Sequence, residues 1–271
     1  MNCFYIFFDW TVILSAYYLF VKFPNVITFI FLVIILASRQ HAFFANQHEA
    51  SHGYLHSNPI VNEWLSTIFC SIPMGHNYYY FMQYHLLHHR FLNTDLDPSY
   101  VPIKNDPNWF FPMKKKQFYL LSLKDFLGLN YKVMTFYETL YSRHSVSFRY
   151  YIDRYSYYFI STGIAYALTR DWKISLLCTL AWAIAKYSVL VWFIRIRTII
   201  EHSGYIPNNL QSRDVVGSVW EKFFIIPHHV GLHGLHHAKP EVPAWQLNAS
   251  EAPLLSPRVF GKDGVMKVLL E

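Results

Sequence analysis

The chain is poor in charged residues. Of its 271 residues, 15% are charged and 53% are hydrophobic, and the mean hydropathy is +0.15. A soluble domain carries about 25% charged residues. The shortage of charge excludes an intrinsically disordered chain, a nucleic-acid-binding tail and an ordinary water-soluble enzyme. It predicts an integral membrane protein that crosses the bilayer several times.

The chain also has few cysteines. Cys3, Cys70 and Cys178 are widely spaced, so they form neither a CxxC motif nor a disulfide framework. A thiolate zinc site and a dithiol redox motif are thereby excluded. The first apolar run has no preceding positive charge and no small-residue cleavage site after it, so no cleavable signal peptide is expected.

Long apolar segments predict four membrane-spanning helices, since a helix needs about 20 mostly apolar residues to cross the hydrocarbon core. The predicted spans are about residues 4–21, 26–45, 155–169 and 174–194. The expected fold is an all-α polytopic membrane protein, with four transmembrane helices in two hairpins and a single domain over residues 1–271. Residues 60–82 are a weaker apolar run, interrupted by Pro73 and Gly75, for which we expect a re-entrant or interfacial helix.

Basic residues are distributed unevenly about these spans. The two hairpin turns hold only Lys22, Arg170 and Lys173 of the 23 basic residues. By the positive-inside rule, the opposite side faces the cytosol. We therefore expect cytosolic termini and a cytosolic helical cap made of residues 46–153 and 195–271, in the bacterial inner membrane or the endoplasmic reticulum. Inside the fourth span, Lys186 either snorkels to the cytosolic interface or lines a polar cavity.

Histidine is the residue type in excess. The chain has 15 histidines against 17 acidic residues, and most of them fall in clusters. Residues 48–52 (HEASH) place two imidazoles at i and i+4, while residues 85–89 (HLLHH) and 233–237 (HGLHH) each place three at i, i+3 and i+4. On a helix such positions share one face, so each cluster points its imidazoles in one direction. His202 stands alone after the fourth predicted span.

These clusters and His202 together supply nine imidazoles on the same predicted side of the membrane. Neutral imidazole ligates iron, copper, nickel and zinc. Nine ligands exceed the roughly six positions of an octahedral ion, so the pattern predicts two metal ions in one site at the membrane face. Of the remaining histidines, only His229 is considered as a supporting residue of that site.

The three boxes and their surroundings resemble one protein family. HEASH, HLLHH and HGLHH resemble the HxxxH, HxxHH and HxxHH boxes of membrane-bound fatty acid desaturases and hydroxylases. Residues 85–98 (HLLHHRFLNTDLDP) are similar to the family's second box with the Asn-Thr-Asp-x-Asp-Pro that follows it, and residues 197–204 (RTIIEHSG) are similar to its extra-histidine segment. The resemblance covers about residues 5–250. The chain departs from it after the third box, where residues 238–243 (AKPEVP) replace a hydrophobic-Phe-Pro segment, a difference that bears on the substrate.

The resemblance implies a non-haem di-iron centre, with two iron ions and O₂ as co-substrate, that attacks an unactivated C–H bond. Carried onto this chain, the implied iron ligands are His48, His52, His85, His88, His89, His202, His233, His236 and His237. No catalytic residue is expected beyond these ligands. Ligand imidazoles usually donate their second N–H to a carboxylate or a carbonyl. The carboxylates placed to accept such hydrogen bonds are Glu49, Asp95, Asp97 and Glu201.

The implied reaction is desaturation of a fatty acyl chain. Hydroxylation of a lipid or acyl chain is the alternative, followed by carotenoid ketolase or hydroxylase activity. The pattern does not separate them, because all begin by removing one hydrogen and differ in whether a second is removed or a hydroxyl group is returned.

The expected partners follow from what the chain lacks. It has no cytochrome b5 haem motif, no iron–sulfur pattern and no flavin-binding glycine loop, so a separate donor of the ferredoxin or cytochrome b5 type is expected. Membrane lipid and a lipid substrate are the other expected partners, and nucleic acid is not. Residues 114–116 (KKK), among aromatic residues, predict either a solvated interfacial anchor or a docking site for an anionic headgroup, donor or carrier.

A rival interpretation starts from the first box. HEASH is also an HExxH motif, in which the glutamate of a zinc metalloprotease is the general base. The chain would then be an intramembrane protease, with Asp95 or Asp97 as the third zinc ligand. That interpretation leaves the six histidines of the other two boxes and His202 without a role, whereas the di-iron interpretation uses all nine. A metal transporter would instead need polar ligands within the spans.

Overall fold

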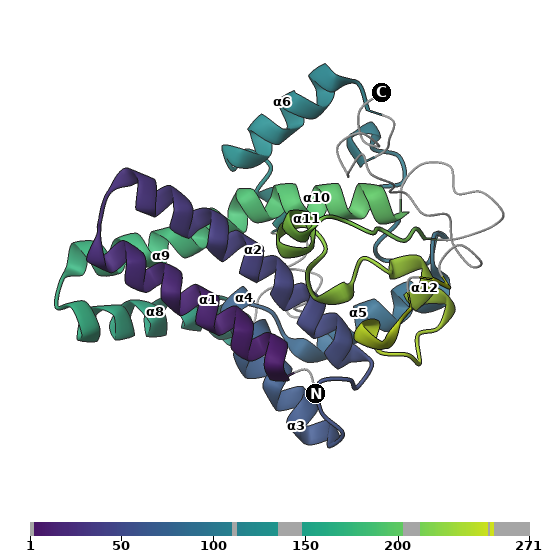
Figure 1. Ribbon diagram of the computed structural model, residues 1–271, viewed down its shortest axis with the longest axis horizontal. Helices are drawn as coiled ribbons and strands as arrows, with labels where there is room; N and C mark the ends of the chain where they lie inside the picture. The colour runs from purple at the N-terminus through teal and green to yellow at the C-terminus, as the bar shows by residue number, and fades with distance from the viewer. Residues whose placement is uncertain (1–2, 110–112, 135–147, 203–211, 249, 252–271) are drawn as a thin grey trace. The chain divides into compact units, whose positions relative to one another are not determined.

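The computed structural model describes most of the chain as helices (Figure 1). The described residues are 3–109, 113–134, 148–202, 212–248 and 250–251. They contain no β-strand, which confirms the predicted all-α class. Residues 135–147 and 252–271, which belong to the regions predicted to be cytosolic, lie outside the described residues.

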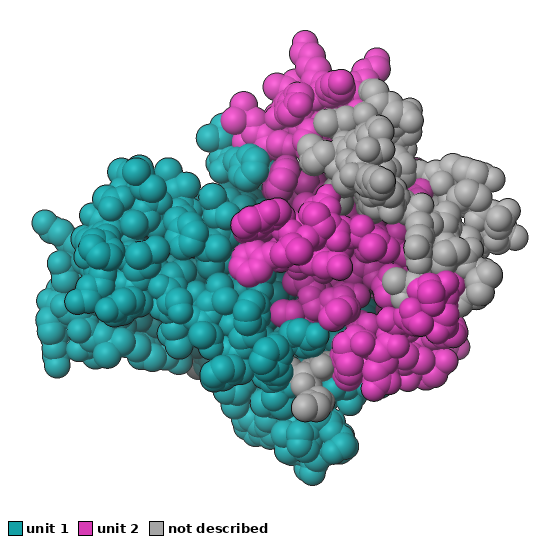
Figure 2. All heavy atoms as spheres, viewed as in Figure 1, with its two compact units in different colours: residues 1–82, 125–191 teal, residues 83–124, 192–271 magenta. Residues whose placement is uncertain are grey.

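The chain divides into two compact units, each built from two separate stretches (Figure 2), and its organisation as a single domain stays a prediction. Unit 1 comprises residues 1–82 and 125–191, and unit 2 comprises residues 83–124 and 192–271.

Unit 1 begins with a helical hairpin. α1 (Cys3–Lys22) and α2 (Val26–Ser51) pack along each other. α2 begins with a capping box, because the Asn25 side chain accepts from the backbone N–H groups of Ile27 and Thr28 while the Thr28 hydroxyl accepts from Asn25 N. Both helices are long and apolar enough to cross a membrane. α2 continues past the predicted end of its span at residue 45, so it carries the first histidine box near its C-terminus.

A buried ion pair holds this hairpin together. Asp9 on α1 and Arg39 on α2 are 0% and 1% exposed, and Arg39 Nη1 donates to Asp9 Oδ1 over 2.8 Å. The other carboxylate oxygen of Asp9 accepts from Asn46 Nδ2, also over 2.8 Å. The carboxylate thus contacts α2 at two places two helical turns apart, which fixes the register of the two helices.

The second hairpin of unit 1 is formed by α8 (Phe148–Thr169) and α9 (Trp172–Tyr187). After a break at Ser188, α10 (Val189–His202) continues the chain, and the combined segment Trp172–His202 is apolar enough to cross a membrane. α8 contains the third predicted span but is not among the three candidate spans of the described chain. Its N-terminal half carries Arg149, Asp153 and Arg154, and tyrosines further lower its hydropathy. The structure therefore supports three spans, and the fourth stays a prediction.

Short helices fill the region between the hairpins. α3 (Pro59–Ser66), the π-helix η1 (Thr67–Ser71) and α4 (Ile72–Met74) lie where an interfacial or re-entrant segment was predicted. α4 ends at Gly75, whose φ of +68° favours glycine. Lys186 of α9 is fully buried and donates to the backbone carbonyl of Met74, so it lies at a polar site and does not snorkel.

Unit 2 is built from short helices that carry the other boxes. α5 (Tyr78–Phe91) brings the second box into it, and α10 brings His202. The remaining elements are η2 (Pro107–Trp109), α6 (Lys115–Phe126), α11 (Val219–Phe224), η4 (Pro227–His229), α12 (His233–Ala238) and η5 (Ala244–Gln246). The third box occupies most of α12.

Candidate metal centre

The second box is held by a carboxylate that follows α5. Asp97 is fully buried, and its two oxygens lie 2.9 and 3.0 Å from Nδ1 of His88. The same carboxylate accepts from the backbone N–H groups of Asn93 (2.9 Å) and Ser99 (2.8 Å), so the loop fixes its orientation. With Nδ1–H donating to Asp97, the Nε2 lone pair of His88 is directed toward the other imidazoles.

The third box is held by a carboxylate that no sequence motif marks. Asp214 is fully buried, and its Oδ1 accepts from the backbone N–H of Leu235 over 2.9 Å. This contact satisfies one of the N–H groups that the first turn of α12 leaves without a helical partner. Asp214 therefore sets the position of the helix that carries His233, His236 and His237.

His202 lies at the C-terminal end of α10 next to Glu201. Glu201 Oε1 accepts from Arg197 Nε over 2.8 Å, and its Oε2 lies 3.8 Å from His233 Nε2, beyond hydrogen-bond distance. The backbone carbonyl of Glu201 accepts from Arg213 N over 2.9 Å. These contacts fix the end of α10, and with it His202.

Four imidazoles from three segments of unit 2 converge. The ligand atoms of His88, His202, His233 and His237 all lie within 4.8 Å of one another. His233 Nε2 is 2.9 Å from His202 Nε2 and 3.1 Å from His237 Nε2. Two imidazole nitrogens about 2.1 Å from one ion and at right angles would be about 3.0 Å apart. The spacing and the all-nitrogen donor set therefore fit a bound transition metal.

The other boxed histidines of unit 2 also approach one another. His236 Nε2 lies 3.1 Å from His89 Nε2, and the rings of His85 and His89 have centroids 4.5 Å apart. In unit 1, the first box places the ring centroids of His48 and His52 5.3 Å apart near the end of α2. Glu49 Oε1 lies 3.0 Å from His48 Nδ1, the arrangement that Asp97 makes with His88. The boxed histidines are thus buried or half-buried and grouped as the i, i+3 and i+4 spacing predicted.

Burial favours the neutral form of His52 and His237. It lowers the pKa of His52 to about 4. It also lowers the pKa of His237 well below its usual value, and the nearby His88 and His89 add to this shift. A neutral imidazole presents the lone pair that a metal ion needs, so ligation at neutral pH requires no proton to be expelled.

The four carboxylates that were expected to support the ligands lie in different surroundings. Glu49 and Asp97 each lie against a boxed histidine, and Glu201 lies near His233 while bonded to Arg197. Asp95 is placed differently from the expectation, because its side chain is 81% exposed and pairs with Lys104 Nζ at 2.5 Å. The turn after α5 points Asp97 inward and Asp95 outward, and that difference depends on tertiary packing. His229 lies in η4 with a positive φ of 66°, and its supporting role stays a prediction.

The comparison with models of protein families agrees with this geometry. A search of the curated proteins found no match. The family model described as fatty acid desaturase matches residues 24–256, a segment that contains the eight boxed histidines and His202. The family is one of membrane-associated oxidoreductases, and the histidine groups fit a metal site. The chain belongs to the fatty acid desaturase family.

Proposed function

We propose that the protein is an O₂-dependent membrane fatty acyl desaturase that introduces a C=C bond into an acyl chain at a histidine-ligated di-iron centre. The observation that carries this proposal is the convergence of four imidazoles from α5, α10 and α12 within unit 2. The eight boxed histidines and His202 hold two iron ions, and His88, His202, His233 and His237 are ligands of one of them. The family match supports an acyl substrate.

The chain's own carboxylates orient the ligand imidazoles. Asp97 accepts a hydrogen bond from Nδ1–H of His88, and Glu49 does the same for His48, which directs each Nε2 lone pair to the metal. Asp214 anchors the helix that carries the third box. Bound iron supplies the activation of O₂ that removal of hydrogen from a methylene group requires.

Hydroxylation of an acyl chain or another lipid is the second candidate within the same family. Carotenoid ketolase or hydroxylase activity is the third. The family match favours desaturation only through its description, because the ligand set is the same for all of these reactions. Product analysis separates them, since desaturation changes the mass of the acyl chain by the loss of two hydrogens and hydroxylation by the gain of one oxygen.

The zinc protease interpretation has less support. In the structure Glu49 lies against His48, and the two acids considered as third ligands have other partners. Asp97 is bonded to His88 and Asp95 is exposed beside Lys104. The protease also assigns no role to the imidazoles that converge in unit 2.

We further propose that the histidine boxes face the cytosol, in the bacterial inner membrane or the endoplasmic reticulum, and that a separate ferredoxin or cytochrome b5 delivers electrons. Lys114, Lys115 and Lys116 are exposed at the start of α6, where they offer positive charge to an acidic donor or to lipid headgroups.

The metal content of the purified protein tests the proposal. We expect two irons per chain in protein purified from iron-supplied cells, and an acyl product that lacks two hydrogens in the lipids of those cells. His88→Ala and His236→Ala should lose iron and turnover, while His56→Ala, which changes an exposed histidine outside the boxes, should keep both. One zinc per chain without iron, or full turnover in His88→Ala, would overturn the proposal.

A further inference from the structure

Unit 1 contains an apolar cleft that the proposed reaction does not use. It has a volume of about 440 Å³ and lies among α1, α8 and α9. Its walls include Ile13 and Leu14 from α1, Ile160 and Ile164 from α8, and Cys178 from α9. The volume lies in the range of about 300–1,000 Å³ that is usual for ligand pockets.

The cleft results from the way the helices pack. α1 packs on α2, α2 on α9, and α9 on α8, so the first and last helices of this series face each other across the cleft. Tyr17 of α1 reaches across it and donates to the backbone carbonyl of Cys178 over 3.4 Å. Because α1 and the helix segment that contains α9 are candidate membrane spans, we infer that the cleft lies at the depth of the hydrocarbon core.

Aromatic side chains close one end of the cleft. Trp10 and Tyr157 line it there, and behind them lie Phe43 and Trp182. The ring centroids of Trp10 and Phe43 are 5.6 Å apart, those of Phe43 and Trp182 are 6.4 Å apart, and those of Tyr157 and Trp182 are 4.6 Å apart. These four residues form a wall between the cleft and the C-terminal end of α2, which carries His48.

From this wall the cleft extends away from the first histidine box. Its lining on α1 runs from Trp10 to Val21, about 16 Å at 1.5 Å per residue. Val21 and Leu168 of the lining lie beside the two hairpin turns, at the opposite end of the helices from His48.

The lining is mostly apolar. The hydroxyl groups of Ser161, Thr169 and Thr179 donate to carbonyls of their own helices, those of Tyr158, Ala165 and Ser175, and the Tyr17 hydroxyl donates to the Cys178 carbonyl. None of the lining residues is charged. A cleft of this chemistry selects a hydrocarbon, and in a bilayer the available hydrocarbon is an acyl chain.

We propose that this cleft binds one acyl chain of a bilayer lipid, which enters sideways from the membrane and is distinct from the reacting substrate. The bound chain replaces the van der Waals contacts that an empty apolar cleft forfeits. The aromatic wall keeps the chain away from the first histidine box.

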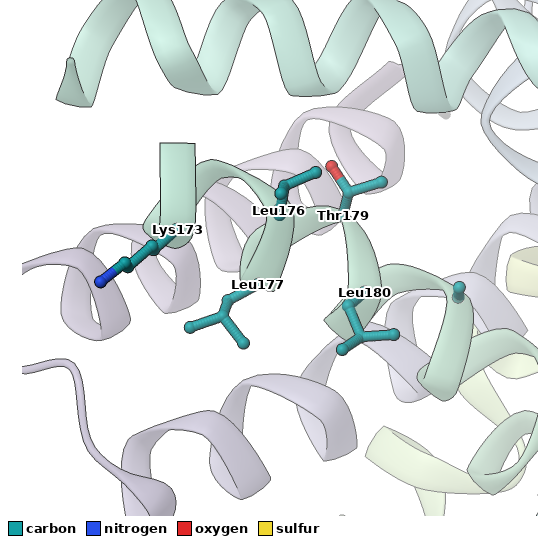
Figure 3. Close-up of a pocket in the computed structure, with 6 residues that line it drawn as sticks. Lys173, Leu176, Leu177, Thr179 and Leu180 are labelled. Atoms are coloured by element: carbon teal, nitrogen blue, oxygen red, sulfur yellow. The ribbon is translucent and has the colours of Figure 1, made fainter. Parts of the chain in front are cut away.

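A second groove on α9 provides a comparison. It is about 640 Å³, and Figure 3 shows Lys173, Leu176, Leu177 and Leu180 along it. All of its lining residues belong to α9, so it offers a single wall, whereas three helices surround the cleft. We therefore expect a lipid to exchange freely from this groove and to be retained in the cleft.

Retention of lipid by purified full-length protein tests the proposal. The protein is reconstituted in nanodiscs of palmitoyl-oleoyl-phosphatidylglycerol and then released for native mass spectrometry. The wild type should retain one lipid per chain. Ala165→Phe, which fills the cleft, should retain none, and the matched change Ala183→Phe in the α9 groove should retain one. Ser161→Leu provides a smaller filling change if Ala165→Phe does not fold.

Three results would overturn the proposal. The first is a wild-type protein without retained lipid, and the second is equal retention in the cleft-filling and groove variants. The third is loss of acyl turnover in Ala165→Phe with iron content unchanged, which would show that the cleft holds the reacting chain. We expect iron content and turnover to be unaltered in that variant.

Discussion

Asp97→Asn tests the metal centre most directly, because it removes a charge and keeps the shape of the side chain. The Asp97 carboxylate accepts from His88 Nδ1 and from the backbone N–H groups of Asn93 and Ser99. An asparagine has one oxygen and an NH₂ group, so at least one of these donors would face another donor. The remaining bond to His88 would also be neutral, and hydrogen bonds to charged groups are about twice as strong.

The expected loss follows from these contacts. Removing a residue that orients a ligand histidine commonly lowers metal affinity about 10- to 100-fold, or about 1.4–2.8 kcal/mol. The burial of Asp97 places the effect toward the upper end, because a buried donor without an acceptor costs about 1–3 kcal/mol. We therefore expect iron affinity to fall close to 100-fold.

Competition with an iron chelator measures this loss at constant pH in detergent. Asp95→Asn is the matched control, because it makes the same chemical change two residues away at an exposed carboxylate. It should leave iron affinity unchanged and alter the free energy of unfolding by less than about 0.5 kcal/mol. Equal iron affinity in the two variants would refute the assignment of Asp97 as the residue that orients His88.

Three further predictions follow from buried groups. Asp9→Leu should lower the free energy of unfolding by about 3–5 kcal/mol, since it removes the carboxylate that compensates the buried charge of Arg39. Asp9→Leu with Arg39→Leu should recover much of the loss. Denaturation in detergent measures both variants, and an equal loss in the two would contradict the role of the pair. Asp214→Ala should loosen α12 and lower iron content, and wild-type iron content would show that the contact with Leu235 is dispensable. The metal-free protein should become less stable as pH falls from about 6.5 toward 4. Burial lowers the pKa of His52 and His237, so the unfolded chain binds more protons than the folded chain over this range. A free energy of unfolding that is constant between these pH values would contradict the prediction.

Much of the candidate site could be predicted from the sequence because its pattern is local. The spacing of i, i+3 and i+4 within each box determines that the imidazoles share a helix face, and the structure places residues 85–89 on α5 and 233–237 on α12. Glu49 is adjacent to His48 in the chain, so its contact with that ring also follows from short-range geometry. The spans of the first hairpin follow from the length and apolarity of their segments.

Tertiary structure decided what depends on residues far apart in the chain. Asp214 supports the third box only because residues 214 and 215 lie beside the start of α12, about 20 positions later in the chain. Lys186 is buried because α9 packs where the Met74 carbonyl can accept a hydrogen bond from its ammonium group, a partner that hydropathy does not reveal. Asp95 and Asp97 are two residues apart in the sequence, and only the fold of their loop determines that Asp97 is buried while Asp95 is exposed. The sequence by itself determines local periodicity and the tendency of a segment to leave water. The hydrogen-bond partner of a buried polar group comes from a distant segment, so only the tertiary structure determines it.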